Sequence, residues 1–250
     1  MFDEAHQRSR ALLGEAPFRR LASAHVAVFG VGGVGGWFAE ALVRTGARRL
    51  TLIDDDFVAA SNMNRQPQAL PATVGHPKVE VLRDMLLAIS PDAEITARQE
   101  RYTPETSRNF AELLCGTDFV VDAIDSVDCK AHLILTCTSV ASCQESQLPI
   151  LFSSMGAALR MDPTAIRTAP FSKVEGDGLA RALRNRFRKM QMPLPNHICV
   201  YSKEPPKKTG GEIKGNIMPV TCAFGMALAA LVLAECTPAG EAQFGGGGGI

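Results

Sequence analysis

The chain has 250 residues, and its 26 basic and 26 acidic side chains give a formal net charge of zero at pH 7. Apolar residues make up 46% and charged residues 21%, which is ordinary for a soluble globular protein, and the length fits one α/β domain with a substantial core. A neutral balance creates no global field for nucleic acid, so any such partner would need a local basic patch.

The seven cysteines lie far apart in the sequence, at positions 115, 129, 137, 143, 199, 222 and 236. An odd number without close pairs argues for reduced thiols and a cytoplasmic location. The first ten residues are polar, so we expect no signal peptide. The uncharged run 222–234 is too short to cross a bilayer, so we expect a buried helix and no membrane span.

Residues 1–24 are expected to form a polar lead-in helix with four apolar contacts, Leu12, Leu13, Phe18 and Leu21. A β-branched run at 26–29 then leads into a glycine cluster and an amphipathic segment, which predicts a strand, a tight turn and a helix. Gly30 and Gly32 would allow the turn and a close approach to a ligand, and Gly35 would let the helix pack on the strand. Backbone N–H groups at such a helix start face a phosphate, so we predict a nucleotide site.

A second apolar strand at 50–53 runs into Asp54, Asp55 and Asp56. Asp54 is placed to accept hydrogen bonds from both ribose hydroxyls. Dinucleotide enzymes share this glycine spacing and acidic strand end, so these residues alone do not separate NAD from ATP.

Three later features favour a triphosphate that is cleaved. Asn64 and Arg65 are candidate phosphate contacts, Lys78 begins a helix within 75–90, and Asp125 follows a strand at 118–122. Charge develops on a departing pyrophosphate, and a Mg²⁺ ion must be held beside it. We therefore predict Asp125 as the Mg²⁺ ligand, with an N-cap role as the simpler alternative.

Further strands are expected at 94–99 and 149–152, with helices at 104–115 and 131–144. Strands that alternate with helices predict a Rossmann-like, doubly wound and mainly parallel sheet. After Gly156 the segments become short and alternating, so a C-terminal substrate-binding extension is expected from about 156, inside a domain spanning 25–236. The tail 237–250 is glycine-rich and is expected to be disordered.

A basic cluster lies between positions 181 and 214, where nine cations face only two acidic residues. Such a cluster in a neutral chain is typical of a phosphate-backbone contact, although a solvated helix face is the common alternative. The candidate RNA contacts are Arg181, Arg184, Arg188, Lys207 and Lys208.

The glycine cluster, Asp54 with Asp56, the 62–66 block, Lys78 and the 122–126 block follow one another in an order that resembles the adenylation core of the ubiquitin-activating-type superfamily. Four further segments, 9–15, 153–157, 161–164 and 201–205, resemble the branch of that superfamily that acts on threonylcarbamoyladenosine in tRNA. The resemblance covers roughly residues 8–236.

This resemblance implies ATP and Mg²⁺ as cofactors, tRNA as the partner, and dehydration of the modified base through an acyl adenylate. It also implies a homodimer in which Arg10, or Arg8 in another register, reaches the partner subunit's triphosphate. The implied catalytic residues are Arg65, Lys78, Asp125 and Arg10. The implied nucleotide contacts are Gly30, Gly32, Gly33, Gly35, Asp54, Asp56, Asn64, Arg65, Gln66 and Lys78.

Three other functions are less consistent with the residues. An adenylyltransferase for a ubiquitin-like sulfur carrier is disfavoured because relatives of that kind hold zinc with Cys-x-x-Cys pairs, which this chain lacks. Arg65 and Lys78 argue against an NAD-dependent oxidoreductase, and the intact phosphate-directed residues argue against a non-catalytic binding module. Cys222 could take part in a sulfur relay with a cysteine desulfurase, but Cys199 and Cys222 fit inert, buried thiols better.

Overall fold

The computed structural model describes residues 2–138, 148–208, 210 and 214–237. Its strands are β1 (His25–Phe29), β2 (Arg49–Ile53), β3 (Glu94–Arg98), β4 (Phe119–Asp122), β5 (Ile150–Ser154), β6 (Ile166–Pro170) and β7 (Ile198–Ser202). They form one seven-stranded sheet in the order β3-β2-β1-β4-β5-β7-β6. All neighbouring pairs are parallel except β6 and β7.

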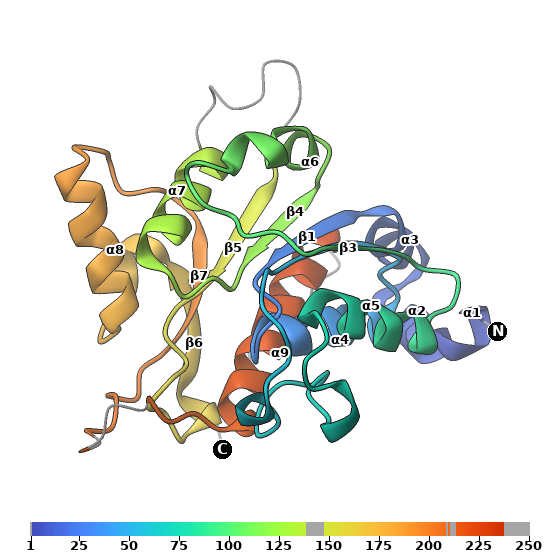
Figure 1. Cartoon of the computed structure of the whole chain (residues 1–250). Coiled ribbons are helices and arrows are strands. Elements are labelled where there is room, and N and C mark those ends of the chain that lie inside the picture. The colour runs from blue at the N-terminus through green and yellow to red at the C-terminus, as the bar shows by residue number, and fades with distance from the viewer. Residues whose placement is uncertain (1, 139–147, 209, 211–213, 238–250) are drawn as a thin grey trace, which may run out of the picture.

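Helices cover both faces of this sheet (Figure 1). One face carries α4 (Gly35–Thr45), α5 (Lys78–Ile89) and α9 (Met218–Cys236), and the other carries α6 (Ala111–Cys115), α7 (Val127–Thr138) and α8 (Gly178–Lys189). Alternation along β1 explains the two layers, because Val26 and Val28 join one apolar cluster while Ala27 and Phe29 join the other. The predicted doubly wound, mainly parallel sheet is confirmed.

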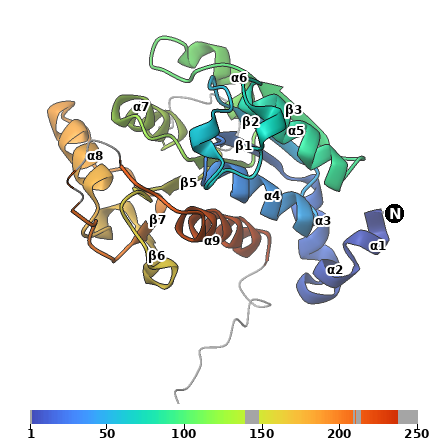
Figure 2. The same cartoon turned by 60° about the horizontal axis from the view of Figure 1, so that its bottom comes forward.

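The N-terminal segment differs from the single lead-in helix that the sequence predicted. It forms α1 (Phe2–Ala5), α2 (Gln7–Leu13) and α3 (Glu15–Ser23), because Gly14 takes a φ of 84° and breaks the helix between α2 and α3. Phe18 and Leu21 are buried as expected, but Leu12 is 82% exposed and makes no core contact. The rotated view in Figure 2 shows that α1 and α2 lie apart from the sheet.

Two other boundaries also differ from the prediction. The helix predicted over 104–115 is confined to α6 and a 3-10 turn at Ser107–Phe110, and the helix predicted over 131–144 begins earlier, at Val127. The expectations for 139–147 and for 238–250, including Cys143 and the disordered tail, lie outside the described residues.

Helix α9 has 19 residues, more than the uncharged run suggested, and by length and composition it is the one helix of the described chain that could cross a membrane. It packs against α4 so closely that a Cβ on Gly225 would lie 2.8 Å from the carbonyl oxygen of Val34. Phe224, Leu228 and Val232 are fully buried in the same cluster, so α9 is a core helix of this fold, as the sequence predicted.

Candidate nucleotide and acceptor site

The order of the strands reverses between β1 and β4, and in open parallel sheets ligands bind at such a switch point. The loops that follow these two strands meet closely there. A Cβ on Gly30 would lie 2.8 Å from the carbonyl oxygen of Ala123, and Gly30 has a φ of 89°. Only glycine fits this position, which is where a cavity of about 930 Å³ opens.

The cavity has two halves, built from the two parts of the chain. One half comes from the loops after β1, β2 and β4, and its lining includes Gly30, Gly32, Gly33, Asp54, Asp56, Asn62, Arg65, Gln66, Lys78 and Asp125. The other half comes from the segment after β5 and the start of α8, and its lining includes Gly156, Leu159, Arg160, Asp177, Gly178 and Leu179. One continuous space therefore joins the predicted nucleotide end to the predicted substrate extension.

The glycines of the turn divide into two kinds. A Cβ on Gly35 would lie only 1.9 Å from the carbonyl oxygen of Gly30, so Gly35 serves the packing of α4 and does not line the cavity. A Cβ on Gly32 would meet nothing closer than Gln66 Nε2 at 3.8 Å, so its side of the turn is open to a ligand. Gly32 therefore remains a candidate nucleotide contact. Gly35, which the resemblance also placed among the nucleotide contacts, does not reach the cavity.

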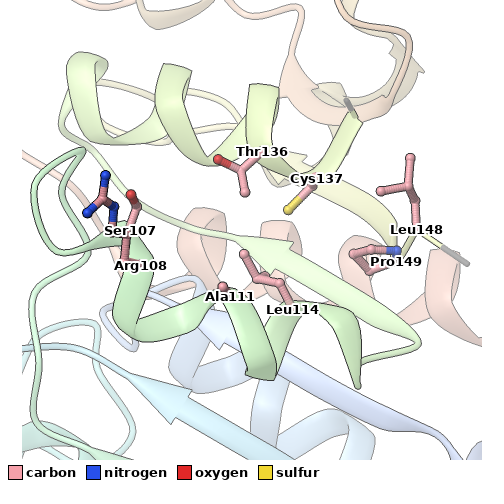
Figure 3. A pocket seen from close by; sticks show the side chains of 8 residues that line it. All are labelled: Ser107, Arg108, Ala111, Leu114, Thr136, Cys137, Leu148 and Pro149. Atoms are coloured by element: carbon pink, nitrogen blue, oxygen red, sulfur yellow. The ribbon is translucent and has the colours of Figure 1, made fainter. Parts of the chain in front are cut away.

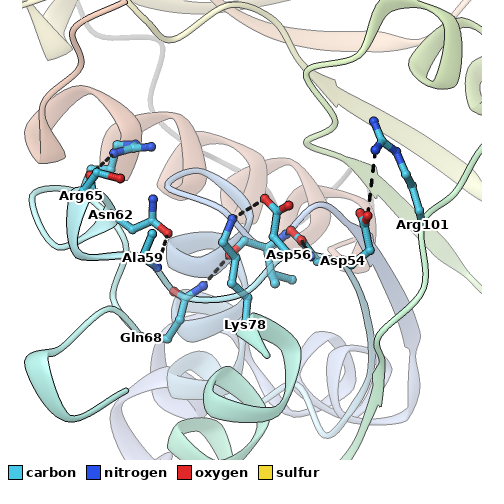
Figure 4. A network of polar contacts seen from close by, with 11 residues as sticks. Asp54, Asp56, Ala59, Asn62, Arg65, Gln68, Lys78 and Arg101 are labelled. Carbon is cyan, nitrogen blue, oxygen red and sulfur yellow. Dashed lines mark hydrogen bonds and ion pairs between the residues drawn. The ribbon is translucent and has the colours of Figure 1, made fainter. Parts of the chain in front are cut away.

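Asp54 ties the end of β2 to the glycine turn (Figure 4). Its carboxylate accepts hydrogen bonds from the backbone N–H of Val31 at 2.8 Å and of Asp56 at 2.9 Å. Burial raises the pKa of Asp54, while these backbone donors and Lys78 oppose that rise. A carboxylate has further lone pairs, so Asp54 can still accept from a ribose hydroxyl.

Lys78 is the first residue of α5, and its ammonium enters the cavity beside Asp56. The Nζ to Oδ2 distance is 2.6 Å, and the lysine side chain is 7% exposed against 65% for Asp56. The N-terminus of a helix already favours anions, so this end of the cavity presents a buried cation at a helix start.

Arg65 lines the cavity, and its Nη1 donates to the carbonyl oxygen of Ser61 at 2.9 Å and to Asn64 Oδ1 at 3.0 Å. Trp37 Nε1 donates to the Arg65 carbonyl oxygen, which anchors the segment to α4. Burial lowers the pKa of Arg65, but a guanidinium remains charged.

The structure places Asn64 away from the cavity lining, where its amide donates to the Asn216 carbonyl oxygen at 2.9 Å. Asn62 lines the cavity in its place. Gln66 also lines it, and its Oε1 is buried without a hydrogen-bond partner among the described residues. An unmet buried acceptor of this kind suits a ligand donor such as a hydroxyl or an amine.

Asp122 and Asp125, at the end of β4, have different environments. Asp122 is fully buried, with Oδ2 at 2.9 Å from Lys130 Nζ and at 2.9 Å from Ser153 Oγ, which donates to it. Burial raises the pKa of Asp122, and Lys130 opposes that rise. Asp125 is exposed and lines the cavity, so it is the carboxylate that a ligand can reach.

Arg10 does not line the cavity of its own chain. It lies 3.5 Å from Glu15 and its guanidinium sits over the Phe18 ring at 4.9 Å, whereas Arg8 on the same helix is exposed. Neither arginine is part of the cavity lining within one chain.

The basic cluster is not one uniform surface. Arg184 donates to the carbonyl oxygens of Phe171 and Val174 and lies over the Phe171 ring. Its guanidinium therefore stabilises the fold, and this differs from the RNA contact that the sequence predicted. Four of the five candidate contacts are exposed as expected, namely Arg181, Arg188, Lys207 and Lys208. Lys214 lines the cavity itself.

Sequence reasoning missed two charged residues of the second half, Arg160 and Asp177, which are 3% and 5% exposed. Asp177 had a readable signal, because it caps the start of α8 by accepting from Ala180 N–H at 2.8 Å. Nothing local in the sequence distinguishes Arg160 from the solvated arginines near it.

Cys129 is buried at the wall of the cavity, whereas Cys199 and Cys222 do not line it. Burial raises the pKa of Cys199 in β7 and the pKa of Cys222 in α9, so both thiols stay protonated near neutral pH.

A second, smaller cavity of about 200 Å³ between α6 and α7, bordered by Cys137, is mainly apolar and holds no carboxylate (Figure 3). Within the described residues, Asp54, Asp55 and Asp56 form the one acidic or thiol group close enough to share a metal.

A doubly wound sheet with a glycine turn, an arginine and a lysine around one cavity at the switch point defines a nucleotide-binding α/β protein. The chain belongs to the ThiF family, whose model matches residues 6–243.

The similarity to named relatives covers most of the chain. A tRNA threonylcarbamoyladenosine dehydratase from Bacillus subtilis is 36% identical over an alignment of 241 residues that covers 91% of this chain and 91% of the relative. Crystal structures of the Escherichia coli tRNA N6-threonylcarbamoyladenosine dehydratase, in complex with AMP and with ATP, have TM-scores of 0.85 and 0.84 at 34% identity, covering 94% of each chain. A molybdopterin-synthase adenylyltransferase from Salmonella typhimurium matches 57% of this chain at 36% identity.

Proposed function

We propose that this protein uses ATP to dehydrate threonylcarbamoyladenosine in tRNA, closing a ring on the modified base through an acyl adenylate. The observation that carries the proposal is the continuous cavity. It joins the nucleotide end to the half formed by the segment after β5 and the start of α8, which we call the acceptor half because it would receive the substrate that is adenylated. The dehydratases of Bacillus subtilis and Escherichia coli match nearly the full length of the chain, which supports the same activity here.

At the nucleotide end, the backbone of Gly32 and Gly33 would approach the phosphates, and Asp54 would accept from the ribose. Arg65 and Lys78 would then offset the negative charge that develops as pyrophosphate leaves. Lys78 is suited to this because its present partner, Asp56, is largely solvated and can release it to a phosphate. The crystal structures with AMP and ATP support nucleotide binding by this fold.

Mg²⁺ fits the oxygen donors around the cavity. The ion is usually held by one or two carboxylates together with substrate phosphates. Asp54 already accepts from two backbone N–H groups, whereas Asp125 is exposed on the cavity wall. Asp125 would therefore hold the ion, which would supply charge neutralisation at the phosphates.

The reaction needs no protein nucleophile. The substrate carboxylate attacks the α-phosphorus, the bond to the β-phosphate oxygen breaks, and pyrophosphate leaves with the electron pair. The carbamoyl group then attacks the activated carbonyl and gives up one proton to water, the bond between the carbonyl carbon and the AMP oxygen breaks, and AMP leaves with the electron pair. Because both nucleophiles belong to one substrate, proximity favours the second step, and the protonated thiols of Cys199 and Cys222 are consistent with this scheme.

The tRNA would lie against the exposed cations Arg181, Arg188, Lys207 and Lys208, with Lys214 at the cavity edge. A homodimer belongs to the proposal, with Arg10 or Arg8 crossing to the partner subunit's nucleotide. Of the two, Arg8 is exposed and so is sterically readier, while Arg10 is half-buried against its own helices. A sulfur relay with a cysteine desulfurase finds little support, since burial keeps Cys222 protonated.

The alternative is adenylation of a ubiquitin-like sulfur carrier, the half-reaction that fits the more partial match to a molybdopterin-synthase adenylyltransferase. The experiment that decides is turnover of purified protein with ATP, Mg²⁺ and tRNA that bears threonylcarbamoyladenosine. Loss of one water from the modified nucleoside, dependent on ATP, supports the proposal. No loss of water, together with pyrophosphate exchange stimulated by a ubiquitin-like carrier, would favour the alternative.

A further inference from the structure

Arg160 is a buried cation in the acceptor half of the cavity, at the end of the segment that follows β5. Its side chain is 2% exposed, and its Nη2 lies 3.5 Å from both the carbonyl oxygen of Gly176 and Asp177 Oδ2. Its Nε and Nη1 are buried without a hydrogen-bond partner among the described residues. Buried donors left unmet are costly, so their presence in a cavity wall points to a ligand acceptor.

Asp177 does not meet this demand, because its carboxylate is already committed. Its Oδ1 accepts from Ala180 N–H at 2.8 Å, and its Oδ2 accepts from Gly156 N–H at 3.1 Å. Asp177 Oδ2 is therefore shared between Gly156 N–H and Arg160, and its ion pair with Arg160 is long, at 3.5 Å. It fixes the guanidinium at the base of α8 and leaves its other N–H groups for something that enters the cavity.

We propose that Arg160 binds the carboxylate of the acceptor substrate and presents it to the α-phosphate of the nucleotide. The inference rests on the proposed function and names the group that holds its reacting carboxylate. A guanidinium attracts a carboxylate through its charge and through directional N–H donors, so it can hold one carboxylate oxygen in a fixed position. One oxygen would be held by Arg160 while the other forms the new bond to phosphorus.

Depth favours this carboxylate over a phosphate of the tRNA backbone. A polymer backbone meets exposed cations such as Arg181 and Arg188, whereas a side chain that is 2% exposed can be reached only by a small group inserted into the cavity. The threonyl carboxylate, carried at the end of a base substituent, is such a group.

The test uses protein saturated with a non-hydrolysable ATP analogue, so that the nucleotide end is filled. Binding of the free nucleoside threonylcarbamoyladenosine and of its methyl ester is measured by calorimetry. Wild-type protein should bind the acid about 10- to 100-fold more tightly than the ester, because the ester lacks the charge that Arg160 pairs with. Arg160→Met should abolish that preference, and Arg160→Lys should restore part of it.

Arg167→Met is the matched control, because Arg167 is an exposed arginine of the same half that does not line the cavity. It should keep the wild-type preference. Equal binding of acid and ester by wild type, or a preference kept by Arg160→Met, would overturn the inference. The inference would also be overturned if Arg160→Met lost as much affinity for unmodified tRNA as for the modified nucleoside. Arg160 would then bind a backbone phosphate.

Two readouts separate this inference from its premise. Thermal unfolding shows whether Arg160→Met is folded, and Arg160→Lys carries the test if it is not. Turnover of modified tRNA by wild type tests the proposed function, whereas the preference for acid over ester tests Arg160 directly. Normal turnover without that preference would therefore reject the role of Arg160 alone.

Discussion

Lys78 Nζ lies 2.6 Å from Asp56 Oδ2, yet the lysine is buried and the aspartate is mostly in water. The pair is therefore asymmetric, since solvent screens one partner and the protein encloses the other. Replacing Asp56 by a phosphate oxygen would cost little, because the carboxylate is already hydrated. We interpret this pair as a resting arrangement that nucleotide binding exchanges.

Replacing the Lys78 side chain should remove catalysis without unfolding the protein. Lys78→Met keeps the apolar stem, and the backbone bond from Lys78 N–H to the Asp56 carbonyl oxygen is unaffected. Loss of one cation at the developing charge should lower the rate of ATP-dependent turnover about 100-fold or more. Lys173→Met, an exposed lysine outside the cavity, is the control and should turn over normally. Near-normal rates for Lys78→Met would remove Lys78 from the site.

The two kinds of glycine in the turn should respond differently to alanine. Gly35→Ala puts a methyl group against the Gly30 carbonyl oxygen and should lower the free energy of unfolding by about 3 kcal/mol, measured by urea denaturation. Gly32→Ala has open space at its Cβ and should unfold like wild type, but with weaker ATP binding. The reverse pattern would show that the turn is misassigned.

Asp125 should set the requirement for Mg²⁺. Asp125→Asn should raise the half-saturating Mg²⁺ concentration for turnover about 10-fold or more, since the ion would no longer have a charged protein ligand. Asp128→Asn is the neighbouring control, because Asp128 is exposed and paired with Arg186 at 2.7 Å outside the cavity. An identical Mg²⁺ titration for Asp125→Asn and wild type would contradict the assignment.

The exposed arginines of α8 should contribute to tRNA binding through phosphates. Charge reversal at Arg181 and Arg188 should weaken binding and reduce the slope of log affinity against log salt by about one for each phosphate that is no longer neutralised. Arg184→Met should instead lower stability, because its guanidinium binds two backbone carbonyl oxygens. Filter binding over a salt series and urea denaturation check the two statements, and an unchanged slope would leave α8 as a solvated face.

Local patterns were enough to predict the core of this fold. A β-branched run followed by a glycine turn and an amphipathic segment predicts β1 and α4 from a few neighbouring residues, although the contact that requires glycine at position 30 comes from Ala123. The choice between Asn62 and Asn64, and the burial of Arg160 and Arg184, depend on contacts with distant segments. An arginine that braces a carbonyl and one that faces solvent have the same appearance in a sequence, so those roles needed the structure.

Attack of a substrate carboxylate on the α-phosphate can be followed by isotope tracing. Threonylcarbamoyladenosine in tRNA would be labelled with oxygen-18 in its carboxylate and turned over with unlabelled ATP, and the released nucleotide would be analysed by mass spectrometry. Attack by the carboxylate predicts AMP that carries one labelled oxygen, because the bond broken in ring closure lies between that oxygen and the carbonyl carbon. Unlabelled AMP, or ADP as the product, would contradict adenylation in this cavity.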